Sequence, residues 1–91
     1  MIDNSQKNEI IRKRLLWRAT HRGIKEMDII VGGFAKANLD FMDENRLKEF
    51  EILLEIPDQD LLSWATGQSE FPLDLGSALL LEMISFRPVL K

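Results

Sequence analysis

The segment WRATHRGIKEMD, residues 17–28, decides how the first half of the chain folds. Before it, apolar residues recur at the spacing of one helix face, which predicts a first helix over residues 5–21. After it, the same periodicity predicts a second helix over residues 24–37. Gly23 is the expected stop between them, because helices commonly end at a left-handed residue and glycine adopts that conformation without strain. So short a connection predicts a helical hairpin.

The apolar positions indicate which residues enter the core. The first helix has Ile11, Leu15 and Ala19 along one face, widened by Ile10, Leu16 and Trp17. The second helix contains Gly32-Gly33, and glycine costs roughly 1 kcal/mol in a helix relative to alanine. We therefore expect a bend or close helix packing at these two glycines. Trp17 and Trp64 are both predicted to be core residues.

Helical periodicity also covers the rest of the chain. The three further predicted helices are 43–55, a short one between Pro57-Asp58 and Gly67, and a last one from 74 or 75 to 85, with a loop over 68–74 before it. No alternating strand pattern is present in the sequence. We therefore predict a single all-α domain over residues 1–91, with frayed tails at 1–5 and 87–91.

The composition argues against catalysis and metal binding. The 91 residues include no cysteine and a single histidine, His21, which alone is a poor nucleus for a metal site. His21 has no serine or cysteine partner nearby, and no glycine pattern that would cradle a phosphate is present. Asp58 and Asp60 are better explained as helix-capping residues than as an acid–base pair. We predict no catalytic, cofactor or metal site, and hence no enzyme.

Charge is distributed unevenly along the chain. Residues 1–25 contain seven cationic and two acidic residues, a balance of +5, whereas residues 26–91 contain five cationic and thirteen acidic residues, a balance of −8. Arg14, Arg18 and Arg22 would form one row on a helix and could contact phosphates, which keeps nucleic-acid binding open as an alternative. No stretch approaches the ~20 apolar residues of a membrane span, and the first residues do not resemble a targeting signal.

The densest polar chemistry is the corner Arg22-Gly23-x-x-Glu26. One interpretation is structural: Gly23 caps a helix, while Arg22 and Glu26 each interact favourably with a helix dipole. The other is functional: an exposed corner presents a cation and an anion, and Gly23 lets the backbone of a partner approach. The residues alone leave both open. Such a corner suits protein recognition rather than chemistry.

Three blocks of sequence resemble those of the SdhE (YgfY-type) flavinylation factors. Residues 22–28, RGIKEMD, resemble the RGxxE signature of that family with its following aspartate. Residues 50–58, FEILLEIPD, and residues 60–67, DLLSWATG, resemble two further blocks in the same order, and residues 39–43 resemble the connection that precedes them. The similarity extends over roughly residues 8–85.

This resemblance implies a compact five-helix bundle that assists covalent attachment of FAD to the flavoprotein subunit of succinate dehydrogenase, or of the related fumarate reductase. It implies that Arg22, Gly23 and Glu26 contact this client, and we include the neighbouring His21, Lys25 and Asp28 in the predicted partner-binding set. FAD would be attached to the client and not bound tightly by this chain. The expected location is the bacterial cytoplasm, since eukaryotic relatives would carry a mitochondrial presequence. Members have also been described as antitoxin components acting on cytoskeletal proteins, which leaves another kind of interaction module as an alternative.

Overall fold

The computed structural model describes residues 4–72 and 78–87. In order, its elements are α1 (Asn4–Thr20), α2 (Lys25–Asn38), the short 3₁₀ helix η1 (Leu39–Phe41), α3 (Glu44–Leu53), α4 (Asp58–Thr66) and α5 (Ala78–Ser85). No strand occurs in these two ranges, so the prediction of an all-α fold with five α-helices is confirmed. The expected start of the last helix, at 74 or 75, lies outside the described residues.

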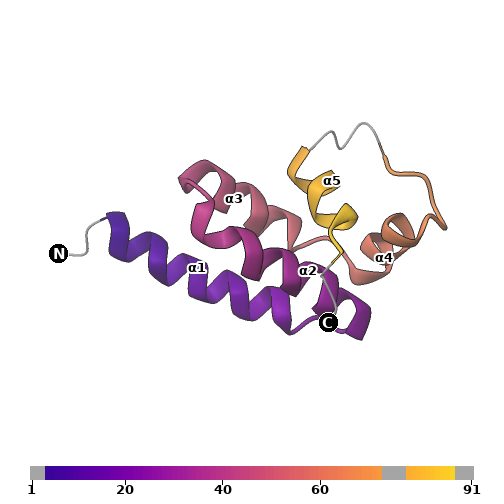
Figure 1. Ribbon diagram of the computed structural model, residues 1–91, viewed down its shortest axis with the longest axis horizontal. Helices are drawn as coiled ribbons and strands as arrows, with labels where there is room; N and C mark the ends of the chain where they lie inside the picture. The colour runs from indigo at the N-terminus through magenta and orange to yellow at the C-terminus, as the bar shows by residue number, and fades with distance from the viewer. Residues whose placement is uncertain (1–3, 73–77, 88–91) are drawn as a thin grey trace.

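The first three α-helices lie lengthwise beside one another, and α4 and α5 lie together at the end where α1 turns into α2 (Figure 1). The centre of the core is Phe50 of α3, which is fully buried and whose ring centroid lies 6.0 Å from that of Phe34 on α2. Leu15 and Ala19 of α1 and Leu61 of α4 are also fully buried. Each helix therefore buries one apolar face against a common core, as its periodicity predicts.

The buried face of α1 is narrower than the sequence predicts. Ile11 and Leu16 pack at its edge, but Ile10 is 55% exposed and Trp17 is 62% exposed. Trp17 lies two residues from both Leu15 and Ala19, and two residues correspond to about 200° around a helix. Its side chain therefore points away from the core that those two residues enter. The prediction that Trp17 is a core residue is wrong.

The two adjacent glycines allow close packing, as predicted. A Cβ atom on Gly32 would lie 3.0 Å from Thr20 Cγ2 and 3.3 Å from the carbonyl oxygen of Ala19. The backbones of α1 and α2 can therefore approach each other only because this position lacks a side chain. A Cβ atom on Gly33 would lie 2.9 Å from the ring of Phe86, which follows α5. Gly32-Gly33 thus accommodates α1 on one side and the end of α5 on the other.

Replacing Gly32 with leucine is expected to lower the free energy of unfolding by about 2 kcal/mol, because overpacking a close helix contact forces the backbones apart. Urea denaturation of the two proteins measures this difference. Ala37→Leu, at an exposed position of the same helix, is the matched control and should leave the unfolding midpoint nearly unchanged. Equal stability of the Gly32→Leu variant and the wild-type chain would contradict the close packing of α1 on α2.

Two arginines fasten irregular segments to the helices. Arg12 donates from Nε to the Leu39 carbonyl at 2.9 Å and from Nη2 to the Met42 carbonyl at 2.8 Å, which holds η1 against α1. Arg87 donates to the carbonyl of Ala65 at 2.7 Å and so joins the ends of α4 and α5. The sequence predicts frayed tails at 1–5 and 87–91. Of these positions the structure describes 4 and 5, which are helical, and Arg87, which is hydrogen-bonded; the other positions lie outside the described residues.

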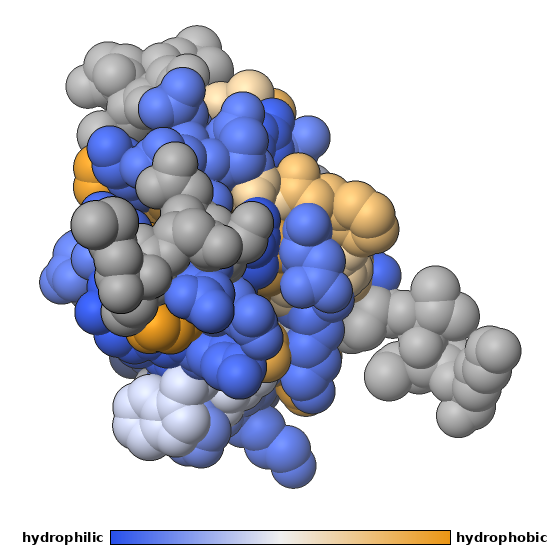
Figure 2. Space-filling model, turned by 90° about the vertical axis from the view of Figure 1, so that its left-hand side faces the viewer, coloured by the Kyte–Doolittle hydropathy of each residue, from blue (hydrophilic) through white to orange (hydrophobic). Residues whose placement is uncertain are grey.

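The surface is mainly hydrophilic where it is seen from the end that holds the start of α1, with apolar side chains in a few separate groups (Figure 2). Large exposed apolar side chains in the described residues are Ile10, Trp17, Ile29, Phe41, Ile52 and Leu81. They are distributed over α1, α2, η1, α3 and α5. Scattered exposed apolar residues are ordinary on a soluble domain, so any one of them needs a local reason before it is assigned a role.

Candidate functional site

The candidate site is the corner between α1 and α2. Arg22 lies in this corner, and its side chain is only 10% exposed. The guanidinium points toward the turn between α3 and α4, where Nη1 donates to the Leu54 carbonyl at 2.8 Å and Nη2 donates to the Ile56 carbonyl at 2.9 Å. Carbonyl groups at a helix C-terminus lack intrahelical partners and carry partial negative charge. Arg22 therefore supplies hydrogen bonds to carbonyl groups at the C-terminal end of α3 and in the turn that follows it.

Asp58 completes this arrangement. One carboxylate oxygen accepts from Arg22 Nε at 2.6 Å, and the other accepts from the backbone N–H of Gly23 at 2.9 Å. The side chain of Asp58 is 17% exposed, so this ion pair is largely removed from solvent. We call Arg22, Gly23 and Asp58 the corner lock. The expectation that Asp58 is a capping residue is wrong. Pro57 occupies the N-cap position of α4, and the Asp58 carboxylate instead binds Arg22 and Gly23 in the corner between α1 and α2.

The backbone of the corner is held from a second side by Asp28, whose carboxylate accepts from the N–H of Arg22. Helix α1 already ends at Thr20, whose hydroxyl donates back to the Leu16 carbonyl at 2.8 Å. The prediction that Gly23 ends the helix in a left-handed conformation is wrong: within the described residues, the positive-φ glycine is Gly67, which ends α4 as predicted. Two carboxylates, rather than a left-handed cap, fix the turn at Gly23.

The outward surface of the corner differs from the expected pair of charges. Arg22 is turned inward, so the cation at the surface is Lys25, beside the exposed carboxylate of Glu26. In the described part of the chain neither Lys25 nor Glu26 makes an ion pair. Gly23 is exposed between the lock and these two side chains. Of the predicted partner-binding set, His21, Gly23, Lys25 and Glu26 face solvent, whereas Arg22 and Asp28 hold the corner in place.

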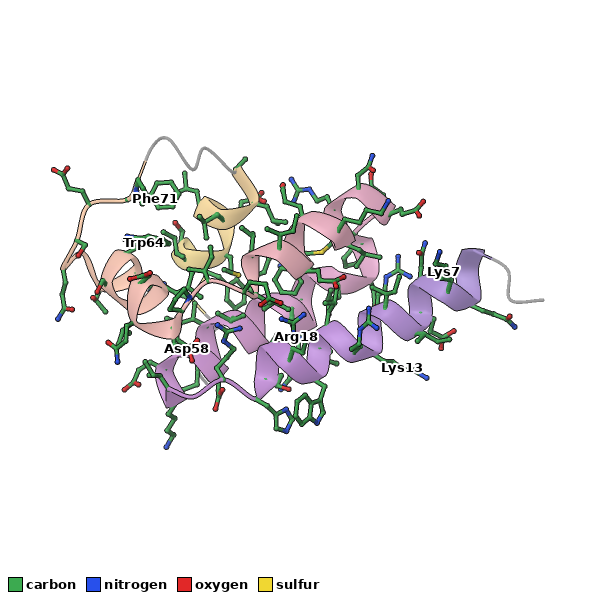
Figure 3. The ribbon with its side chains drawn as sticks, turned by 180° about the vertical axis from the view of Figure 1, so that it is seen from behind. Lys7, Lys13, Arg18, Asp58, Trp64 and Phe71 are labelled. Atoms are coloured by element: carbon green, nitrogen blue, oxygen red, sulfur yellow. The ribbon has the colours of Figure 1, made fainter. Side chains whose placement is uncertain are left out.

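The basic residues of α1 largely face acids on the same chain. Arg18 binds Glu55 at 2.6 Å, so its side chain extends from α1 toward the residues that follow α3 (Figure 3). Arg14 lies 4.0 Å from Glu51. Arg22 falls beyond the end of α1, so the predicted helical row of three arginines is not formed. These contacts leave less unpaired positive charge on this face for phosphates than the sequence suggests.

The exposed Arg18–Glu55 pair is expected to contribute little to stability. Its side chains are 30% and 72% exposed, and ion pairs in contact with solvent are worth about 0–1 kcal/mol. Glu55→Gln should therefore lower the free energy of unfolding by less than about 1 kcal/mol, as measured by urea denaturation. A loss of about 3 kcal/mol, as expected when a buried ion pair is broken, would show that this pair also holds the helices together.

The two tryptophans belong to different aromatic pairs. Trp64 is partly buried and packs against the edge of the core, where its ring meets that of Phe71 edge-on at 6.0 Å (Figure 3). The prediction that Trp64 is a core residue is confirmed in part. Trp17 instead stacks on His21 in solvent, with ring centroids 4.2 Å apart and an angle of 12° between the planes. A cleft of about 330 Å³ lies between this stack and the corner lock. Sequence reasoning missed this surface, because it assigned Trp17 to the core.

The described residues include no group of three or more His, Asp or Glu side chains placed to hold a metal ion. None of the described helices combines the length and apolar character needed to cross a bilayer. The fold and the site together define a small all-helical protein whose exposed corner presents backbone, one cation and one anion to solvent. Such a surface is typical of the class of protein-interaction factors.

Comparison with known proteins identifies the family. The family model described as "Sdh5: Flavinator of succinate dehydrogenase" matches residues 13–87, which include the whole corner and Asp58. The chain belongs to this family, which is one of FAD assembly factors and not of catalytic enzymes. The resemblance seen in the RGxxE segment and the two later blocks is thereby confirmed.

Relatives come from bacteria and from eukaryotes. The chain is 41% identical over 73 residues to the FAD assembly factor SdhE of Acetobacter pasteurianus, covering 80% of this chain and 67% of that protein. It is 35% identical over 71 residues to the mitochondrial succinate dehydrogenase assembly factor 2 of Dictyostelium discoideum, covering 76% and 50%. The same factor of Schizosaccharomyces japonicus is 40% identical over 72 residues, covering 78% and 50%. The chain thus spans about half the length of these two mitochondrial relatives.

Proposed function

We propose that this chain binds the flavoprotein subunit of succinate dehydrogenase, or of the related fumarate reductase, and promotes covalent attachment of FAD to that subunit. The proposal is supported by membership of the flavinator family and by 41% identity to a bacterial FAD assembly factor. FAD is attached to the client, and we propose no tight flavin site on this chain. The bacterial cytoplasm remains the predicted location.

The docking surface that we propose is the corner at Gly23. The observation that carries it is that one carboxylate, Asp58, binds both Arg22 Nε and the Gly23 N–H while Gly23 itself remains exposed. A surface fixed before binding loses less conformational entropy when a partner arrives. The main chain of the client can approach Gly23 closely, because no side chain intervenes. Lys25 and Glu26 stand beside it as unpaired charges that fix the orientation of the client.

Within this proposal the six predicted residues divide into two roles. Gly23, Lys25, Glu26 and His21 lie at the surface and contact the client. Arg22 and Asp28 act through the backbone of the corner and are positioning residues. An Arg22 variant would thus lose client binding through a displaced corner, and it would lose stability at the same time. A Lys25 or Glu26 variant would lose binding alone.

The chemistry takes place on the client. The resemblance implies that a histidine of the client forms the bond to FAD, and this chain needs no reactive group for that step. Docking at the corner would favour the client conformation in which its histidine and the flavin are in contact. Holding two reacting groups in a productive geometry accelerates a reaction without any further catalytic residue.

A reconstituted flavinylation assay tests the function. The purified flavoprotein subunit is incubated with FAD, with and without this chain, and covalent flavin is read by fluorescence in a denaturing gel, where non-covalent FAD is lost. We expect flavin to accumulate faster when the chain is present. An equal rate in both reactions would contradict the proposed function. A reaction without FAD is the blank.

The two alternatives have less support. Nucleic-acid binding would need the basic face of α1, and there Arg14 and Arg18 lie against Glu51 and Glu55. For the antitoxin-type module, no described contact favours a cytoskeletal partner over a flavoprotein. We therefore propose neither of them.

A further inference from the structure

Trp17 is the aromatic residue of α1, and its side chain is 62% exposed. Its position is unusual for a tryptophan, which buries a large apolar surface when it is packed. Trp64, by contrast, packs against the core. Tryptophan is also one of the residue types that most often dominate the binding energy of protein interfaces. An exposed tryptophan next to a proposed docking corner therefore calls for a local reason.

The orientation of Trp17 is fixed by its neighbours. Its indole stacks on the imidazole of His21 at 4.2 Å, and His21 Nδ1 lies 2.7 Å from the Trp17 carbonyl oxygen and 3.1 Å from Thr20 Oγ1. The two rings therefore form one stack with an exposed indole, which we call the aromatic shelf. A side chain held in a single orientation loses little entropy when a partner covers it.

The aromatic shelf and the corner lock line the same cleft. Its volume is about 330 Å³, and its lining consists of Trp17 and His21 of the shelf, the three lock residues and Arg18. A partner whose main chain lies on Gly23 therefore covers this cleft as well. Its volume is enough for a single large side chain. The polar groups of the lining already have partners on this chain: Arg18 binds Glu55, and Asp58 binds Arg22 and the Gly23 N–H. The cleft therefore offers few free groups to a polar ligand.

We propose that the aromatic shelf takes an apolar or aromatic side chain of the flavoprotein subunit, on the segment whose main chain passes Gly23; this rests on the proposed function. The shelf supplies apolar contact area, and the corner supplies backbone access. Beyond Gly23, the unpaired Lys25 favours a carboxylate and the unpaired Glu26 favours a cation on the same client segment. The client segment is therefore expected to carry a large apolar residue with charged residues of both signs close by.

Calorimetric titration of the flavoprotein subunit with variants of this chain tests the aromatic shelf. Trp17→Ala is expected to raise Kd about 30-fold, the effect typical of a central interface tryptophan. Trp17→Phe retains a flat ring and should raise Kd less than about 5-fold. The matched control is Phe41→Ala on η1, at the other end of α2, where the aromatic side chain is 86% exposed. It should leave Kd within about 2-fold of wild type, as expected of residues outside an interface.

A second measurement does not depend on a substitution. The chain is labelled with 5-fluorotryptophan, and the Trp17 resonance is assigned from the spectrum of the Trp17→Phe variant. On saturation with the unlabelled flavoprotein subunit, the fluorine signal of Trp17 should shift while that of Trp64 stays in place. An unmoved Trp17 signal in the saturated complex would overturn the aromatic shelf, whatever Trp17→Ala does to folding.

The Gly23→Arg variant separates the two proposals. If Gly23→Arg loses binding and Trp17→Ala binds like wild type, the corner stands and the aromatic shelf is wrong. If both bind like wild type, the docking surface of the proposed function is wrong. If both lose binding and the Trp17 signal shifts in the wild-type complex, both proposals are supported.

Discussion

Asp58→Ala should lower the free energy of unfolding by about 3 kcal/mol, because removing one partner of a largely buried ion pair leaves the other charge unpaired. Arg22 would keep its bonds to the Leu54 and Ile56 carbonyls, but Nε would lose its acceptor. The Gly23 N–H would lose its acceptor as well. Urea denaturation followed by far-ultraviolet circular dichroism measures the change.

The control for this experiment lies one half-turn away. Asp60 is in the same first turn of α4, but its side chain is exposed and makes no ion pair with the described residues. Asp60→Ala removes an acid from the same helix end, which is worth about 0.3–1 kcal/mol through the helix dipole. If Asp58→Ala costs no more than Asp60→Ala, the corner lock does not hold the α1–α2 and α3–α4 turns together.

Coupling between the two ends of the lock can be measured directly. Arg22→Met should destabilise the chain to a similar extent, since Asp58 would then be left without its cation. The double variant should cost clearly less than the sum of the two single variants, because the second substitution removes a group that has already lost its partner. Strict additivity would mean that Arg22 and Asp58 stabilise the fold independently.

Gly23→Arg should reduce the client's flavinylation rate by 30-fold or more, on the order expected when a contact at the centre of an interface is lost. Gly23 is exposed, does not have a positive φ, and a Cβ atom there would lie 3.4 Å from Asp58 Oδ2, an ordinary contact distance. The backbone can therefore carry a side chain. What the arginine blocks is the approach of the client.

Two variants make the result at Gly23 interpretable. Gly23→Ala adds a single methyl group and should give an intermediate rate if close approach is what matters. Ala37→Arg places the same large cation at an exposed position at the far end of α2 and should flavinylate the client like wild type. Normal flavinylation with a folded Gly23→Arg variant would contradict the proposal that the client docks at this corner. An equal loss of flavinylation rate with Ala37→Arg would contradict it as well.

The helices were predictable because their signals are local. The spacing of Leu15, Ala19 and Phe50 places each of them on a buried face, and the observed helix bounds lie close to the predicted ones. Gly67 ends its helix as predicted, with φ +79°. These features depend on neighbours a few residues away, and a single sequence contains that information in full.

The corner lock was not predictable in the same way. Arg22 and Asp58 are 36 positions apart, and no periodicity connects them. The functional interpretation placed Arg22 at an exposed corner, because its partners Asp58, Leu54 and Ile56 lie 32 to 36 positions further along the chain. One signal could have indicated the pair: both residues lie in the segments that carry the resemblance to the flavinylation factors, 22–28 and 50–58.

Trp17 was predicted to be a core residue, but its side chain is exposed. Its neighbours Leu15, Leu16 and Ala19 are apolar, so the residue was included in a widened apolar face. Counting the rotation along the helix separates it from that face, because two residues correspond to about 200°. The exposed tryptophan could therefore have been found from the sequence by a stricter use of helical geometry. Its stacking on His21 required the structure.

The most direct test of the docking corner is the affinity of the purified flavoprotein subunit for wild type, Gly23→Arg and Ala37→Arg, measured by calorimetric titration. We expect wild type and Ala37→Arg to bind alike, and Gly23→Arg to bind at least about 30-fold more weakly while it unfolds at the wild-type urea midpoint. Binding of Gly23→Arg with wild-type affinity would contradict the account that the client docks at this corner.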